Sequence, residues 1–459
     1  MRRAVSPAAR VVISGAGGMV FPLTLAADFL ALLAPLGAEL VLHDPDLERA
    51  ARTAAAVRAL ADHHGRPLRV TVTADRRAAL RGATHVLLTF QVGGLDAYRA
   101  DVEVPRRYGV DVPAGDTLGP GGIFRFLRST PAFGALAADV REVCPDALVL
   151  NYANPMAMNV LYLNALGVRA MGLCHSIPHT AALLEDLLAV PRGELTYRAA
   201  GINHQAWFLT LEHRGTDLHA RLRDILRRRF LPDHGGYTPW TEGHDTYVGG
   251  QERVRAELLE TFGYVLSESS HHASEYVPYF RRTPEAVKAA LPRRWDYLRG
   301  AEAGLGHEQA TLDAAVDARR ARLEPSAEYG MRIVAATLGS GPEHVYVNVV
   351  NGGLIANLPA DACVEVPAVA DAAGVTPQPA GRLPAPCAGL NLTNVAVQLS
   401  AVEAATQRDP RRIEAAVALD PLTASILDLR DIRAMTRDLI AAQRRWLPAW
   451  AGGEAGVSG

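Results

Sequence analysis

The sequence of 459 residues has little lysine, little cysteine and almost no net charge. Only one of its 47 basic side chains is a lysine, Lys288, so no glycine-rich loop carries the lysine that a Walker-type phosphate loop requires. That class of ATPase is therefore excluded. The formal net charge is −2, which gives no electrostatic reason to expect nucleic acid or an anionic membrane as a partner.

The four cysteines are scattered along the chain without any Cys-x-x-Cys pair. They are Cys144, Cys174, Cys363 and Cys387. This distribution argues against a disulfide framework or a zinc ribbon, and it favours a reducing compartment. The longest apolar stretch, residues 21–42, is interrupted by Asp28 and Glu39, so no membrane span is expected. We therefore expect a cytoplasmic protein.

The first 175 residues alternate strand-length apolar runs with amphipathic helical stretches. The apolar runs are residues 11–14, 39–43, 68–73, 86–90, 147–152 and 169–174. The clearest helical stretches are residues 23–36 and 124–143. Alternation of strands and helices predicts an α/β fold with a Rossmann-like, doubly wound parallel sheet and right-handed crossovers.

From residue 194 onward, strand and helix signals are mixed. The strand-like runs are residues 195–203, 206–212, 344–350 and 363–369, and the helical segments are 251–262, 284–299, 326–338 and 390–450. The Pro- and Gly-rich segment 375–386 is expected to be a surface loop. We predict two joined domains, residues 1–190 and 191–450, the second a mixed α/β domain, followed by a frayed tail of residues 451–459.

A glycine-rich turn, Gly15-Ala16-Gly17-Gly18, follows the first predicted strand and opens a helix. Glycine lets the backbone approach a pyrophosphate, whose charge the helix N-terminus stabilises. Val20 replaces the third glycine of the full fingerprint, so an incidental strand–turn–helix is the alternative. Asp44 ends the second strand, where a carboxylate accepts hydrogen bonds from the adenosine ribose. The pattern predicts NAD rather than NADP, whose extra phosphate Asp44 would repel.

Two further strands end in residues that can bind a metal ion. Cys174-His175-Ser176 follows the sixth predicted strand, and His204 follows a later one. Such strand ends are where open α/β sheets place their ligands. For an arbitrary Cys/His pair, a buried cysteine and a satisfied histidine are the more common situation. Ligand softness alone would favour zinc over manganese.

Three more segments carry candidate polar groups. Asn154-Pro155 ends the fifth strand and turns amides toward the crevice, although asparagine is also a common turn former. The glycine-rich segment 115–122 suits close approach of an oxygen-rich ligand, with Asp116 as a candidate catalytic group and Arg125 as a candidate substrate-binding group. A flexible connection is the alternative. Residues 268–276 concentrate titratable groups, and as an isolated run they are typical of a solvated polar face.

Taken together, and in this order, these segments resemble glycoside hydrolase family four over nearly the whole chain. Residues 348–359, 363–367 and 446–450 are similar to the bacterial α-galactosidase branch. The resemblance implies a lactate/malate dehydrogenase-like architecture, NAD and Mn²⁺ as cofactors, and a homodimer or homotetramer.

The resemblance also implies a mechanism unlike that of glycosidases with two carboxylates. NAD takes a hydride from C3 of the sugar, a base removes the C2 proton, and the leaving group departs from C1 by elimination. Water then adds and the hydride returns to C3. A divalent metal at the C2 and C3 oxygens would polarise the ketone and stabilise the enolate.

Residue by residue, Cys174 and His204 match the family's metal ligands, and Asn154 matches the asparagine that contacts the sugar. His175 stands where phospho-sugar members often carry an aspartate assigned as general acid, a task that imidazole can perform. The C2 base is His272 or Tyr276, because the family's tyrosine falls in a region without a unique alignment. A metal-bound hydroxide is a competitor for that role.

The substrate class is indicated by two positions. Gln91 stands where phospho-glycosidases of the family carry an arginine, and a neutral amide cannot neutralise a sugar phosphate. Cys-His-Ser at residues 174–176 resembles the α-galactosidase form of the motif. We therefore expect hydrolysis of an unphosphorylated α-glycoside, first of all an α-galactoside. Residues 177–179 and Gln205 depart from the family pattern, so an α-glucoside or α-glucuronide is the alternative.

Two other classes of function compete with this one. A NAD-dependent hydroxy-acid dehydrogenase would share the nucleotide-binding half, but it would accumulate NADH and would need no Cys/His metal site. A non-catalytic sugar- or nucleotide-sensing protein would be indicated by the loss of Cys174, His204 or Asn154, and all three are present.

Overall fold

The computed structural model describes residues 9–18, 21–231, 252–291 and 296–452. Its first half contains six parallel strands in the order β3-β2-β1-β4-β5-β6. They are β1 (Arg10–Ser14), β2 (Glu39–His43), β3 (Arg69–Thr73), β4 (His85–Leu88), β5 (Leu148–Asn151) and β6 (Ala170–Gly172). This order is that of the doubly wound dinucleotide-binding fold, which binds ligands at the carboxyl ends of the strands where the order reverses. The predicted α/β fold is confirmed.

The second half of the chain extends the same sheet with antiparallel strands. β11 (Glu343–Val350) pairs with β6, and β12, β7, β8 and β10 follow in that order. The remaining bounds are β7 (Thr196–Ile202), β8 (Gln205–His213), β9 (Thr216–Asp217), β10 (Val265–Leu266), β12 (Cys363–Asp371) and β13 (Gly374–Pro377). β13 pairs with β12, so the prediction of a surface loop over residues 375–386 was wrong for residues 375–377. The domain boundary at residue 190 stays a prediction.

Helices cover the parallel half of the sheet as its alternating pattern predicts. They are α1 (Phe21–Leu32), η1 (Ala34–Leu36), α2 (Leu47–His63), α3 (Arg76–Leu80), α4 (Gly94–Arg107), α5 (Gly119–Val143), α6 (Met156–Ala165) and α7 (Ser176–Leu188). The helix expected over residues 23–36 ends at Leu32 instead, and a short 3-10 turn follows it. Pro35 is the second residue of that turn, and Gly37 closes it at φ 77°, a left-handed conformation that favours glycine.

The helices of the second half differ from expectation at several places, and α8 and α13 were not expected at all. They are α8 (His219–Phe230), α9 (Arg253–Phe262), α10 (Ser270–Ala273), α11 (Pro284–Ala290), α12 (Tyr297–Ala303), α13 (Glu308–Ala321), α14 (Gly330–Thr337), α15 (Ala385–Gln407), α16 (Arg411–Leu419), α17 (Pro421–Ile426), α18 (Leu429–Gln443) and η3 (Ala449–Gly452). The single helix predicted over residues 284–299 is two helices, because Asp296 caps a new one. Ala451 is buried, and the rest of the expected frayed tail, residues 453–459, lies outside the described residues.

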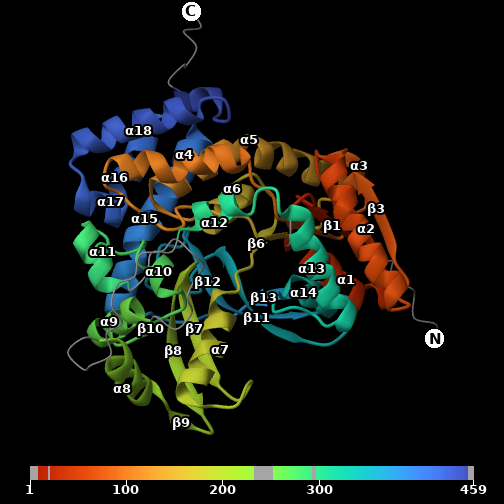
Figure 1. Ribbon diagram of the computed structural model, residues 1–459, viewed down its shortest axis with the longest axis horizontal. Coiled ribbons are helices and arrows are strands. Elements are labelled where there is room, and N and C mark those ends of the chain that lie inside the picture. The colour runs from red at the N-terminus through yellow and green to blue at the C-terminus, as the bar shows by residue number, and fades with distance from the viewer. Residues whose placement is uncertain (1–8, 19–20, 232–251, 292–295, 453–459) are drawn as a thin grey trace, which may run out of the picture.

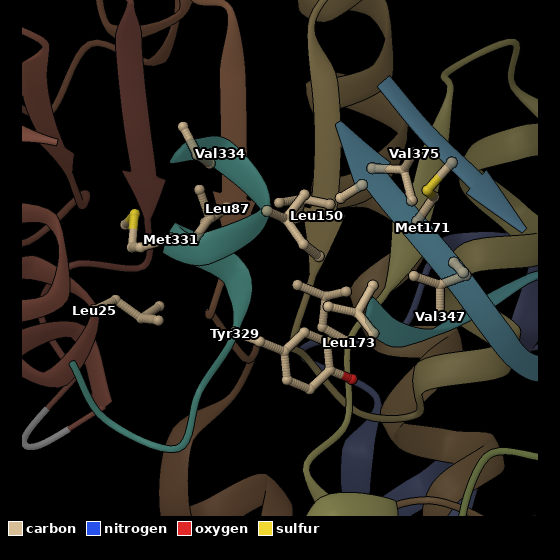
Figure 2. Close-up of a cluster of buried hydrophobic side chains, with 14 of the residues drawn as sticks. Leu25, Leu87, Leu150, Met171, Leu173, Tyr329, Met331, Val334, Val347 and Val375 are labelled. Carbon is tan, nitrogen blue, oxygen red and sulfur yellow. The ribbon is translucent and has the colours of Figure 1, made fainter. Parts of the chain in front are cut away.

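Helices from the second half also complete the cover of the nucleotide-binding half. α13 packs against α2 and α14 against α1, and Figure 1 shows this group at one side of the sheet. Figure 2 shows the resulting core, in which Leu25 of α1, Leu87 of β4 and Met331 of α14 belong to one buried cluster. The two halves of the chain therefore share a hydrophobic core. Among the described residues, no helix is both long and apolar enough to cross a membrane.

Candidate active site

The glycine-rich turn after β1 is held close to the neighbouring strands. Gly15 adopts φ 99°, and a Cβ at this position would lie 2.6 Å from the main-chain nitrogen of Phe90. The main-chain nitrogen of Gly17 donates to Oδ2 of Asp44 at 2.9 Å. A side chain at either glycine would therefore clash with its surroundings. The turn offers the bare backbone and the adjacent carboxylate that a dinucleotide requires.

A cavity of about 910 Å³ lies over the carboxyl ends of the strands. Seven of the predicted site residues line it: Gly15, Gly17, Gly18, Asp44, Asp116, Arg125 and Asn154. The predicted dinucleotide-binding and sugar-binding groups thus face one space. Gln91 also lines this cavity. The other predicted residues, Cys174, His175, His204, His272 and Tyr276, are not part of its lining.

Asp116, Asn154 and Arg125 form one polar cluster in the cavity wall. The amide of Asn154 donates to Oδ2 of Asp116 at 3.0 Å, and Nε of Arg125 donates to the carbonyl oxygen of Asn154 at 3.2 Å. Burial by itself would raise the pKa of Asp116, but the Arg125 guanidinium and the imidazole of His272 hold it below its ordinary value. The cluster therefore presents an ionised carboxylate, an amide and a guanidinium, which suit the hydroxyl groups of a sugar.

Cys174 lies two residues beyond the end of β6 and is buried at 6 % exposure. Its main-chain nitrogen donates to the hydroxyl of Tyr329 at 3.1 Å, and that hydroxyl lies 2.8 Å from the carbonyl oxygen of Cys174. Burial raises the pKa of the Cys174 thiol. The backbone on both sides of the thiol is therefore fixed, and a cation or another positive charge would be needed to stabilise its thiolate.

His204, His272 and Tyr276 make three mutual contacts. Nδ1 of His204 lies 3.0 Å from Nε2 of His272 and 2.9 Å from the Tyr276 hydroxyl, and these two partners are 2.9 Å apart. His204 occupies the β7–β8 turn at φ 60°, a conformation that residues other than glycine rarely adopt. Because His204 uses Nδ1 in these contacts, Nε2 is the nitrogen available to a metal ion.

Residues 270–276 are buried and residues 268–269 partly so, and the interpretation of this run as a solvated polar face was therefore wrong. His272, Glu275 and Tyr276 are 7 %, 6 % and 1 % exposed. The carboxylate of Glu275 accepts hydrogen bonds from the main-chain nitrogens of Ala114 and Gly115 at 2.9 and 3.0 Å, and it lies 3.2 Å from Nδ1 of His272. Glu275 thus links the loop that carries Asp116 to the histidine pair. Although burial opposes its charge, this carboxylate raises the pKa of His272 to about 9.

His175 is the N-cap residue of α7, and its side chain is half exposed. Nδ1 lies 2.8 Å from Oε1 of Glu328, and the ring is 4.5 Å from that of His179. Burial by itself would lower the pKa of His175. The Glu328 carboxylate has the larger effect and raises this pKa to about 9. His175 is therefore protonated at neutral pH, and it is held by Glu328, a partner that sequence analysis did not single out.

The residues around Cys174 and His204 fit a catalytic metal better than a structural one. The described residues hold no group of three or more His, Cys, Asp or Glu side chains placed to bind a metal ion. One thiol and one imidazole leave most coordination positions to other ligands, as in open catalytic sites. Both side-chain polar atoms of Asn203 are buried, and among the described residues they have no hydrogen-bond partner. Such orphaned groups beside His204 are consistent with a site that is completed by an ion and its ligands.

Two asparagines near the site carried no recognisable sequence signal. Gln205, Asn391 and Asn394 form a buried carboxamide cluster next to His204, with Asn391 and Asn394 on the same face of α15. Asparagine inside a helix resembles no catalytic motif, so the cluster could not be read from the sequence. Glu275 lies inside a segment that was singled out, and its three-residue spacing from His272 was the available signal.

Family models and curated relatives match most of this chain. The family described as "Family 4 glycosyl hydrolase" matches residues 10–190, and "Family 4 glycosyl hydrolase C-terminal domain" matches residues 199–423. An α-galactosidase of Bacillus subtilis (strain 168) is 36% identical over 96% of this chain and 99% of its own length. An α-galactosidase of Rhizobium meliloti (strain 1021) is 33% identical over 96% of this chain and 90% of its own length.

Solved structures show the same fold. The crystal structure of the putative glucosidase LplD from Bacillus subtilis superposes with a TM-score of 0.81 at 25% identity, covering 94% of this chain and 99% of that one. A 6-phospho-α-glucosidase from gut microorganisms, solved with NAD and Mn²⁺, gives a TM-score of 0.77 at 22% identity and covers 96% and 99%. Since the family matches account for most of the sequence, this chain belongs to family 4 of the glycosyl hydrolases and is a glycoside hydrolase.

Proposed function

We propose that the protein hydrolyses unphosphorylated α-glycosides, first of all α-galactosides, with NAD and Mn²⁺ as cofactors. The observation that carries the proposal is the single cavity in which the glycine turn and Asp44 face the same space as Asp116, Asn154 and Arg125. The α-galactosidases of Bacillus subtilis and Rhizobium meliloti support the choice of sugar. Gln91 in the cavity wall supports a substrate without a phosphate, because a neutral amide does not compensate a dianion.

Cys174 and His204 would hold the metal ion, and the turn at Gly15–Gly18 with Asp44 would hold the dinucleotide. When bound, NAD supplies a reversible hydride acceptor for C3 of the sugar, and Mn²⁺ supplies a Lewis acid for the neighbouring oxygens. Asp116, Asn154 and Arg125 bind the sugar hydroxyls and orient the ring. Their mutual hydrogen bonds fix that orientation before the sugar arrives.

Two protein groups move protons in this scheme. His175 donates a proton to the glycosidic oxygen as the leaving group departs, and Glu328 orients its ring at 2.8 Å. Tyr276, as its phenolate, accepts the C2 proton, and the imidazolium of His272, whose Nε2 lies 2.9 Å from the phenol oxygen, stabilises that phenolate. Glu275 holds Nδ1 of His272 on the opposite side of the ring.

The test is a panel of p-nitrophenyl α-glycosides incubated with NAD, Mn²⁺ and a thiol reductant, with aglycone release and NADH absorbance followed together. We expect release from the α-galactoside without accumulation of NADH, because the hydride returns to the sugar. Cys174→Ala should abolish release, whereas Cys144→Ala, which removes a buried thiol elsewhere in the chain, should not. Stoichiometric NADH from a hydroxy acid, without aglycone release, would favour a dehydrogenase.

The proposal includes the cytoplasm as the place of action and a homodimer or homotetramer as the working form. All four cysteines of the chain are buried and free of disulfides, which suits a reducing compartment and a thiol that must stay reduced to bind metal. Sedimentation equilibrium of the purified chain gives the oligomeric state directly. A monomer at micromolar concentration would contradict this part of the proposal.

A further inference from the structure

An exposed tyrosine lies at one end of the cavity and has no role in the scheme above. Tyr297, the first residue of α12, lines the cavity although its side chain is 51 % exposed. Large aromatic side chains usually bury most of their area, so an exposed one in a cavity wall is a candidate contact surface for a ligand.

The ring of Tyr297 rests on a fixed support. It packs edge-on against Tyr98, with ring centroids 6.1 Å apart and an interplanar angle of 77°. Tyr98 is buried, its hydroxyl donates to the carbonyl oxygen of Ala114 at 2.6 Å, and the Arg125 guanidinium lies 5.8 Å from its ring centroid. The support of Tyr297 is thus continuous with the polar cluster of Asp116, Asn154 and Arg125.

α12 and its N-cap residue Asp296 make polar contacts with the N-terminal half of the chain. The main-chain nitrogen of Tyr297 donates to the carbonyl oxygen of Pro113 at 2.9 Å. Nη2 of Arg106 donates to Asp296 at 3.0 Å, and Nε of Arg99 donates to Glu302 at 3.0 Å. These contacts hold α12 against α4, in agreement with their packing. The ring therefore has a defined position relative to the sugar-binding cluster.

The cavity has a dinucleotide-binding end and a sugar-binding end, and Tyr297 lies at the sugar-binding end. The wall built by α12 and α13 runs from Tyr297 through Leu305 to Leu312, and α13 packs against α2 beside Asp44. Leu312 therefore belongs to the dinucleotide end and Tyr297 to the opposite end. A sugar held by Asp116 and Asn154 has the dinucleotide on one side, and its leaving group must extend away from it.

We propose that Tyr297, supported by Tyr98, is a stacking platform for the leaving group, and that the preferred substrates carry a sugar in that position. This inference rests on the proposed function and specifies its substrate class. The C–H face of a pyranose ring is apolar and matches the face of a tyrosine, whereas a methyl group offers too little surface to stack. The platform therefore discriminates between leaving groups, and it does not contact the residues that transfer protons during bond cleavage.

The test compares two α-galactosides, one with a glucose leaving group and one with methanol as the leaving group, at saturating NAD and Mn²⁺. For Tyr297→Ala we expect kcat/KM on the disaccharide to fall about tenfold, mainly through KM, as the loss of one aromatic contact implies. The value for the methyl glycoside should stay within about twofold of wild type. Tyr297→Phe keeps the ring and should behave as wild type on both substrates.

Tyr279→Ala is the matched control, because Tyr279 is 46 % exposed and does not line the cavity. An equal loss on both substrates would assign Tyr297 to the galactosyl ring and overturn the inference, as would no loss on either. If Tyr297→Phe loses as much activity as Tyr297→Ala, the hydroxyl of Tyr297 and not its ring makes the contact. That result would also overturn the inference. Failure of the wild type to cleave either substrate would instead refute the proposed function. If the enzyme instead cleaves another α-glycoside, and Tyr297→Ala again lowers activity only for large leaving groups, Tyr297 keeps the proposed role. Only the identity of the cleaved sugar then changes.

Discussion

The carboxamide of Asn394 in α15 donates a hydrogen bond to the carbonyl oxygen of Tyr276 at 3.0 Å, across 118 residues of sequence. The same amide lies 2.9 Å from Oε1 of Gln205, the residue after His204. Asn391, one helical turn earlier, donates to the carbonyl oxygen of Gln205 at 2.8 Å. α15 thus links the turn that carries His204 to the segment that carries Tyr276, and it sets the position of these two side chains relative to each other.

Replacing Asn394 by alanine should weaken both the fold and the reaction. We expect the free energy of unfolding to fall by about 2 kcal/mol, because two buried acceptors lose their donor. We expect kcat to fall more than KM changes, because Tyr276 and His204 lose their relative position. Thr393→Ala, on the exposed side of the same helix turn, is the control. Equal kcat values for wild type and Asn394→Ala in stopped assays would refute the positioning role.

The buried pair of Arg128 and Asp101 should be a principal contact between α4 and α5. Both guanidinium nitrogens of Arg128 donate to the carboxylate at 2.7 Å, and the two side chains are 0 % exposed. Arg128→Ala should lower the free energy of unfolding by about 3 to 5 kcal/mol, since it leaves a buried carboxylate without its charged partner while the amide of Gln443 still donates to it at 2.7 Å. Denaturant unfolding of this variant, of Asp101→Ala and of the double variant measures the coupling. We expect the double variant to lose less than the sum of the two single losses, and simple additivity would contradict the pairing.

His85 should contribute a specific pH dependence to stability. It is buried between Thr84 and Thr337, each 2.9 Å from a ring nitrogen, and burial lowers its pKa from 6.5 to about 4. The unfolded chain therefore binds this proton between pH 6.5 and 4 while the folded chain does not. The free energy of unfolding should decrease by about 3 kcal/mol as the pH falls through this range, beyond what the other groups contribute.

His85→Gln isolates that effect because it removes the titrating ring but keeps an amide that can bond to Thr337. Urea unfolding at several pH values should give a shallower decline for the variant than for wild type between pH 6.5 and 4. Parallel curves for the two proteins would show that His85 takes up its proton equally in the folded and unfolded states.

Asp44 should determine the choice of dinucleotide. Its carboxylate accepts hydrogen bonds from the main-chain nitrogens of Gly17 and Asp46, both at 2.9 Å, and it lines the cavity beside Arg49. Asp44→Ala should weaken NAD binding about tenfold through the lost charge-assisted hydrogen bonds, and it should improve NADP relative to NAD by removing the repulsion. Calorimetric titration of both dinucleotides measures this. Glu48→Ala is the control, and an unchanged NADP/NAD ratio would refute the assignment.

The parallel half of the fold could be predicted from the sequence because most of its strands are buried apolar runs with glycine or polar residues close behind them, whereas the edge strand β3 alternates polar and apolar residues. The sequence therefore located the turn at Gly15 and the strand ends near Asn154 and Cys174. The position of β13 could not be predicted, because its proline and glycine content matches that of a loop and only pairing with β12 makes it a strand.

The site was harder to predict where its groups depend on tertiary contacts. Residues 268–276 have the composition of a surface, and they are buried because Glu275 satisfies two main-chain nitrogens of the loop at Ala114 and Gly115. The sequence placed Tyr297 in the interior of one predicted helix, whereas α11 ends at Ala290 and Tyr297 begins α12. Neither relationship is local, so no spacing or periodicity in the sequence could reveal it.

The central claim is that hydrolysis proceeds through removal of the proton at C2 of the sugar by groups that contact His204. The most direct measurement is hydrolysis of an α-galactoside by the holoenzyme in D₂O, followed by NMR of the released galactose. We predict deuterium at C2, because the proton accepted by Tyr276 exchanges with solvent before it is returned. Galactose that keeps protium at C2, released at an undiminished rate, would contradict the account.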